Sequence, residues 1–152
     1  MRHLETWYLI ADGARARIVT RPDAASAYRT VFADESAAAR ARAHELVSDG
    51  PGHVQESANS ARHAVGPRLD PHRKEEIKFI RGLAAHLNRE AAQGSFDRLV
   101  IYAAPRCLAA LRAGLAPATL KKLHGEHAKD LTKVPLAELP AHLETAGGGH
   151  AL

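Results

Sequence analysis

The segment from Pro71 to Gln93 (PHRKEEIKFIRGLAAHLNREAAQ) constrains the fold most, because it is the longest stretch with one unbroken hydrophobic period. Its apolar residues recur every three or four positions, which places them on one face of an α-helix. They are Ile77, Ile80, Ala84, Leu87 and Ala91. Asp70 can cap the first N–H groups, Pro71 suits the first helical position, and Gly94 can adopt the left-handed conformation that ends the last turn. The sequence therefore predicts a long central helix packed against a core.

Three short segments before this helix have the pattern of antiparallel strands. Residues 6–11 (TWYLIA) are rich in aromatic and β-branched side chains and lead into Asp12-Gly13, a typical hairpin turn. Residues 14–21 alternate small or apolar residues with basic ones, which predicts a partner strand with Arg15 and Arg17 on one face. Residues 28–33 (YRTVFA) alternate again and predict a third strand.

The rest of the chain alternates helical and extended patterns. The alanine-rich residues 35–47 predict a short helix or an irregular segment. After the central helix, the sequence predicts a buried strand at residues 99–104 and two helices at 105–115 and 117–126. An edge strand at 127–134, a last helix at 135–146 and a frayed tail at 147–152 follow.

This order of elements predicts a single α/β domain over residues 1–146, followed by the flexible tail. Three antiparallel strands and two strands reached by helical crossovers form a mixed five-stranded sheet with helices on its faces. The pattern matches the ribonuclease H-like architecture and the related ribosomal L18/S11-type fold.

Composition narrows the cellular setting and the class of partner. A single cysteine, Cys107, cannot form an internal disulfide, and no apolar stretch is long enough to cross a membrane, so we expect a cytoplasmic protein. The N-terminus is too polar for a signal peptide. A net charge of +4 and a pI of about 9.5 are compatible with an anionic partner such as RNA, or with an arginine-rich surface that contacts only water.

A long polar loop, residues 48–70, precedes the central helix and is the first place to look for function. Compact domains rarely contain more than about 15 unstructured residues without a functional reason. Arginine and histidine can donate to phosphate or stack on bases, and a glutamine can read a base edge or orient a water. The candidates in and beside the loop are His53, Gln55, Arg62, His63 and His72. A solvated loop without a ligand is the alternative.

Arg15, Arg17 and Arg106 can extend this surface into a basic rim, with the acidic side chains expected on the far side of the domain. Arg106 begins a helix after Pro105, where free N–H groups also favour anions. A solvated surface is again the alternative.

Three catalytic or metal-binding interpretations are weaker. Asp12 has the position of a nuclease carboxylate, but the neighbouring strand ends offer no acidic partner to complete a two-metal site, and a hairpin turn explains it equally well. The histidines match no metal-binding spacing, so the sequence predicts no metal and no cofactor. Cys107, beside an apolar run, has the character of a buried small hydrophobe rather than a nucleophile.

Several motifs together resemble the bacterial host attachment protein family, over about residues 6–143. They are ADGARARI at 11–18, ELVSDGPGH at 45–53, SARHAV at 60–65, DPHRKEE at 70–76, FDRLVIYAAPRCLAALRAGL at 96–115 and KDLTKVP at 129–135.

The chain is also similar to bacterial relatives of the archaeo-eukaryotic release factors, whose middle domain has this fold. In those proteins a Gly-Gly-Gln loop before a long helix enters the peptidyl transferase centre of the ribosome. Here the corresponding loop, residues 50–55 (GPGHVQ), lacks the contiguous Gly-Gly-Gln.

The resemblance implies a ribosome- or RNA-associated domain with no clear catalytic motif. The alternatives are an interaction or regulatory protein needed for attachment to host cells and, third, a nuclease or peptidyl-tRNA hydrolase. The sequence assigns no catalytic residue and no oligomeric state.

Overall fold

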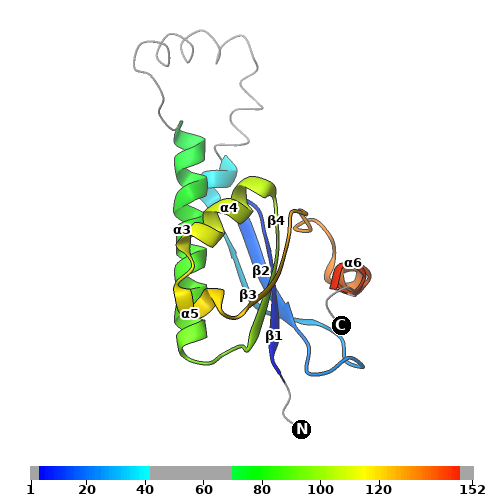
Figure 1. Ribbon diagram of the computed structural model, residues 1–152. Helices are drawn as coiled ribbons and strands as arrows, with labels where there is room; N and C mark the ends of the chain where they lie inside the picture. The colour runs from blue at the N-terminus through cyan, green and yellow to red at the C-terminus, as the bar shows by residue number, and fades with distance from the viewer. Residues whose placement is uncertain (1–3, 42–69, 148–152) are drawn as a thin grey trace.

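A five-stranded mixed sheet forms the centre of the protein, in a computed structural model that describes residues 4–41 and 70–147 (Figure 1). The strands are β1 (Thr6–Ala11), β2 (Arg15–Thr20), β3 (Arg29–Glu35), β4 (Arg98–Ala103) and β5 (Leu123–His127). Their spatial order is β3-β2-β1-β4-β5. The first three strands are antiparallel, whereas β1, β4 and β5 run parallel to one another. The predicted mixed sheet is therefore confirmed.

The central helix α3 (Pro71–Ala92) begins at the predicted residue and ends one residue before the predicted end, with Gln93 as its C-cap. The Asp70 carboxylate accepts a 2.7 Å hydrogen bond from the backbone N–H of Arg73, and Gly94 adopts φ 74° just beyond the helix. The buried face differs from the prediction at two positions. Leu83 is buried, whereas Ile77 is only half-buried, because the core-facing surface of the helix is centred closer to Leu87 than the three-four count suggested.

The two faces of the sheet carry separate cores, as expected when helices cover both sides (Figure 1). Leu9, Ile18 and Ile101 project from one face toward α3 and α4 (Pro105–Gly114). On the other face, the core consists of Ile10, Val19, Tyr28, Val100, Tyr102, Leu131, Leu139 and Leu143. The last two belong to α6 (Leu139–Gly147), which follows a 3-10 turn, η1 (Leu136–Glu138).

The C-terminal third contains the errors of the sequence-based prediction. Helix α5 (Pro117–Leu120) is a single turn, and residues 123–126, predicted as helix, belong to β5. The strand predicted at 127–134 is wrong beyond His127. Residues there form turns in which the Asp130 carboxylate accepts from the backbone N–H of Thr132. Pairing with β4 determines the position of β5, and a strand that contains a central Gly125 has little intrinsic β signal.

Two smaller expectations are refined. The segment 35–47 is helical over 37–41, with the Ser36 hydroxyl accepting from the Ala39 N–H at 3.1 Å, and residues 42–47 lie outside the described part of the chain. The last helix is divided at Leu139, because Pro140 lacks an N–H and fits only a first helical turn. Among the helices that the structure describes, none is both apolar and long enough to cross a bilayer.

Candidate functional site

A crevice opens at the carboxyl ends of β1 and β4. These strands are parallel neighbours, but the chain turns back into β2 after β1 and passes through α4 toward β5 after β4. Open α/β sheets bind ligands where their connections diverge in this way. A cavity of about 400 Å³ lies at this point. The ionisable side chains in its lining are Asp12, His72, Glu76, Arg106 and Cys107.

Glu76, in the second turn of α3, is surrounded by cationic or protonatable groups. Its carboxylate lies 3.1 Å from Nε2 of His72 and 3.5 Å from the guanidinium groups of both Arg73 and Arg106. Its side chain is only 12% exposed. It fits there because residue 13 is glycine: a Cβ at Gly13 would lie 2.6 Å from Oε2 of Glu76. The carboxylate therefore links α3 to α4 through Arg106 and packs closely against Gly13 in the β1–β2 turn.

The Asp12 carboxylate stabilises the hairpin turn through hydrogen bonds. Its Oδ1 accepts 2.8 Å hydrogen bonds from the backbone N–H groups of Ala14 and Arg15, and its Oδ2 accepts from the Thr132 hydroxyl at 3.1 Å. Within the described ranges no group of three or more His, Cys, Asp or Glu side chains could hold a metal ion. The arrangement around Asp12 supports a structural turn rather than a two-metal nuclease site.

Cys107 lies in the wall of the crevice and is 5% exposed. Burial, together with the negative charges of Glu76 and Asp12, raises the pKa of its thiol from 9.0 to about 11. A thiol with this pKa is fully protonated at neutral pH and is a poor nucleophile. The sequence-based interpretation of Cys107 as a buried small hydrophobe agrees with this geometry.

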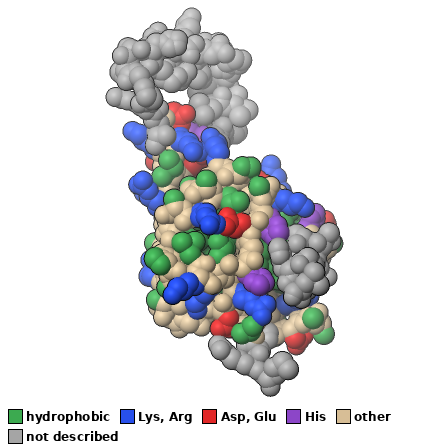
Figure 2. Space-filling model, viewed as in Figure 1, with side chains coloured by type: hydrophobic (Ala, Val, Ile, Leu, Met, Phe, Trp, Pro, Cys, Tyr) green, Lys and Arg blue, Asp and Glu red, His purple; other side chains and the backbone are tan. Residues whose placement is uncertain are grey.

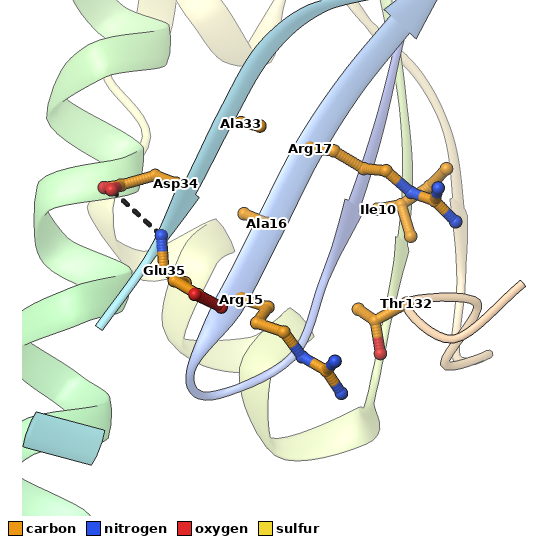
Figure 3. Close-up of a pocket in the computed structure, with 8 residues that line it drawn as sticks. All are labelled: Ile10, Arg15, Ala16, Arg17, Ala33, Asp34, Glu35 and Thr132. Carbon is orange, nitrogen blue, oxygen red and sulfur yellow. Dashed lines mark hydrogen bonds between the residues drawn. The ribbon is translucent and has the colours of Figure 1, made fainter. Parts of the chain in front are cut away.

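A second cavity, which we call the arginine pocket, lies on the sheet face opposite α3 and has a volume of about 480 Å³ (Figure 3). It is lined by Ile10, Arg15, Ala16, Arg17, Ala33, Asp34, Glu35 and Thr132. Arg15 and Arg17 alternate with Ala16 along β2, so both guanidinium groups lie on the Ile10 side of the sheet. Figure 3 shows both side chains extending toward the segment that carries Thr132.

Arg17 has a structural role as well. Its guanidinium group donates to the backbone carbonyls of Leu131 and Val134, which holds the 131–134 segment against the sheet. Its Nε is buried and has no hydrogen-bond partner among the described residues. Burial lowers the pKa of Arg17, and the positive charge of Arg15 lowers it further.

The outer surface of α3 carries a row of cations that we call the basic stripe: Lys74, Lys78, Arg81 and Arg89. At 100° per residue these four positions fall within about 80° of the helix circumference, on the side away from the core. All four residues are exposed. Figure 2 shows Lys and Arg side chains gathered over the upper end of α3 and recurring along the left edge of the molecule, where α3 runs in Figure 1.

A shallow hollow of about 260 Å³ lies on this stripe, lined by Lys74, Ile77, Lys78 and Arg81. The acidic residues of α3, Glu75, Glu76 and Glu90, fall on other sides of the helix. No ion pair joins the four cations of the stripe to a carboxylate in the described part of the chain.

The structure distributes the predicted nucleic-acid-binding residues over two places. His72 and Arg106 meet in the crevice, whereas Arg15 and Arg17 line the arginine pocket. The other four candidates, His53, Gln55, Arg62 and His63, lie outside the described residues. The expectation that carboxylates gather away from the arginines is wrong, because Asp12, Asp34 and Glu35 lie among them; hairpin geometry places the turn and the end of β3 at the same edge.

Sequence reasoning missed the basic stripe, although the signal was present. Lys74, Lys78, Arg81 and Arg89 have helical spacing on the face opposite the apolar one. It also missed Glu76, because nothing in the sequence shows that this carboxylate reaches Arg106 across the domain.

Comparison with known proteins gives one family. Residues 7–143 match the family model described as "protein required for attachment to host cells". No curated protein matches the sequence significantly. The match spans well over half of the chain and includes the five strands apart from Thr6, together with α3 and α4. The chain therefore belongs to the family of proteins required for attachment to host cells.

Proposed function

We propose that this member of the host attachment family is an RNA-binding protein that contacts the phosphate backbone through the basic stripe of α3. The observation that carries the proposal is the row of four exposed cations with no carboxylate partner in the described part of the chain. The proposal rests on this charge distribution and not on the resemblance to release factors. The ribonuclease H-like or L18/S11-like topology expected from the element order stays a prediction.

The composition of the stripe favours a nucleic acid over a protein partner. Protein–protein interfaces are depleted of lysine and rich in aromatic residues at their core, whereas nucleic-acid interfaces are polar and strongly positive. The stripe has two lysines, two arginines and, in its hollow, only Ile77 as an apolar residue. It spans about 22 Å from Lys74 to Arg89 at the rise of an α-helix.

The position of α3 in the fold also supports its outer face as the RNA-binding surface. The helix is capped at Asp70, and five of its residues are buried against the sheet, so its outer face is a rigid platform. Lys74, the first residue of the stripe, lies between His72 and Glu76 of the crevice in sequence, and there the cations Arg73 and Arg106 are already paired with Glu76. Lysine and arginine side chains on such a platform bind phosphate without sequence preference.

The test is a binding titration with a fluorescently labelled single-stranded RNA, monitored by anisotropy. The stripe variant Lys74→Gln/Lys78→Gln/Arg81→Gln should bind much more weakly than the parent. A control variant removes the same amount of charge elsewhere, at the exposed residues Lys121, Lys129 and Lys133, and should bind nearly as well as the parent. An unlabelled duplex DNA competitor determines whether the site prefers RNA.

Two outcomes would contradict the proposal. One is a parent protein that does not bind the RNA at low salt, and the other is equal weakening in both variants, which would mean that only net charge matters. If RNA binding underlies the family phenotype, a strain that carries the stripe variant should attach to host cells as poorly as a deletion strain. Normal attachment by a variant that no longer binds RNA would show that the attachment phenotype does not depend on RNA binding.

A further inference from the structure

The arginine pocket has the size of a small-ligand site. Its volume of about 480 Å³ falls in the range of roughly 300–1,000 Å³ that small-molecule sites occupy. It lies on the sheet face opposite α3, so a ligand bound in it would not contact the basic stripe. Ile10 and Ala33 supply apolar lining on this face, whereas the Ala16 side chain lies on the α3 side of the sheet.

The two arginines of the pocket differ in their carboxylate partners. Arg17 forms no ion pair with any carboxylate of the described residues, and its two hydrogen-bond partners are neutral carbonyls. Arg15 forms one ion pair, with Asp12 at 3.8 Å, and Glu35 lies directly opposite it on β3. Because the two guanidinium groups lie on the same face of β2, each repels the other.

The acidic residues in the lining are engaged elsewhere. Glu35 forms a 2.8 Å ion pair with Arg40, and the Asp34 carboxylate accepts a 2.9 Å hydrogen bond from the backbone N–H of Glu35. Figure 3 shows the Asp34 carboxylate pointing away from the guanidinium groups of Arg15 and Arg17. Neither of these carboxylates forms an ion pair with Arg15 or Arg17, so Arg17 has no carboxylate partner among the described residues.

We propose that the arginine pocket binds the phosphate monoester of a small organic molecule. A phosphate monoester carries a charge of about −1.5 to −2 at neutral pH and matches two guanidinium groups, whereas a carboxylate would neutralise only one. Guanidinium groups bind phosphate oxygens through paired N–H donors. The cavity is much larger than a phosphate group, and its apolar lining suits an organic body attached to it.

Contacts with the backbone orient the Arg17 guanidinium group for phosphate binding. Its hydrogen bonds to the carbonyls of Leu131 and Val134 fix the guanidinium group before a ligand arrives, which reduces the ordering cost of binding. Arg15, with only the longer Asp12 contact, can adjust its position to the phosphate.

The experiment titrates the ¹⁵N-labelled full chain with phenyl phosphate and follows backbone amide chemical shifts. Phenol and inorganic phosphate are the comparison probes, since each carries one half of the ligand. We expect saturable shifts at Ala16, Ala33 and Thr132 with phenyl phosphate, weaker binding of inorganic phosphate, and no binding of phenol.

Two variants test whether the charges of Arg15 and Arg17 are responsible for the binding of phenyl phosphate. Arg15→Gln should raise the dissociation constant for phenyl phosphate about tenfold or more, as expected for the loss of a hydrogen-bonded charge pair. The control Arg29→Gln, at an exposed position of β3, should leave it unchanged. Because Arg17 also holds the 131–134 segment, Arg17→Lys serves as the second variant, with its folding checked from the amide spectrum.

The proposal is overturned if phenyl phosphate causes no saturable shifts at millimolar concentration, if the shifts lie outside the pocket, or if Arg15→Gln binds as tightly as the parent. The RNA titration with Arg15→Gln separates this inference from the proposed function. We expect that variant to bind RNA nearly as well as the parent, whereas the stripe variant should still bind phenyl phosphate.

Discussion

The single cysteine permits a quantitative test of the structure around the crevice. Burial raises the pKa of Cys107 from 9.0 to about 11, with the charges of Glu76 and Asp12 as further causes. In the unfolded chain the thiol should titrate near its ordinary value. The folded state thus keeps a proton that the unfolded state loses between these two pH values, and the stability of the protein should fall across this window.

The magnitude follows from linkage. At about pH 8 the thiol is protonated in both states and has almost no effect on the free energy of unfolding. At about pH 10 the unfolded thiol is mostly ionised and the folded one mostly protonated, which lowers the free energy of unfolding by about 1 kcal/mol. The loss should approach about 3 kcal/mol above the folded pKa.

The assay is urea denaturation of the parent and of Cys107→Ala at both pH values. Tyr102, whose pKa burial raises to about 12, changes stability in the same direction in both proteins, so comparing the two removes its effect. The parent should lose about 1 kcal/mol more than the variant between the two pH values. Equal losses would refute the burial of Cys107 against α3 and the crevice carboxylates.

Three further predictions concern the same framework. Leu87→Ala, at a fully buried position of α3, should lower the free energy of unfolding by about 2–5 kcal/mol, measured by urea denaturation; a loss below 1 kcal/mol would contradict its core position. Gly13→Ala should displace the Glu76 carboxylate and lower the pKa of the thiol, which the pH dependence of alkylation reports; an unchanged profile would contradict the contact. Asn88→Ala removes the acceptor of the buried Thr119 hydroxyl and should cost about 1–3 kcal/mol, whereas Asn88→Asp, which keeps an acceptor, should cost less.

The fold could be predicted from sequence for those segments whose residue pattern fits only one kind of helix or strand. α3 has an uninterrupted period and marked ends, and the β1–β2 hairpin has alternating strands around Asp12-Gly13, so their positions followed directly. The prediction failed at β5, because that strand is held in place by its pairing with β4 and by Lys122, whose carbonyl accepts from the Leu99 N–H. Such long-range pairing leaves little local signal.

The candidate site could be predicted only in part, for a physical reason. Four of the predicted residues, Arg15, Arg17, His72 and Arg106, line cavities, and their binding role stays a prediction. Their grouping was not predicted, because β alternation assigns side chains to opposite faces of the sheet only once the register is known. The register placed Arg15 and Arg17 beside Ile10, away from α3, and so divided one expected surface into two.

The salt dependence of RNA binding tests the central claim most directly. Binding to single-stranded RNA should weaken with a slope of log affinity against log salt of about −0.7 for each phosphate neutralised, or near −3 for the four cations of the basic stripe. The variant Lys74→Gln/Lys78→Gln/Arg81→Gln should reduce the magnitude of the slope by about 2, and the control at Lys121, Lys129 and Lys133 should leave it nearly unchanged. Equal slopes for the parent and the stripe variant would contradict the assignment of α3 as the RNA-binding surface.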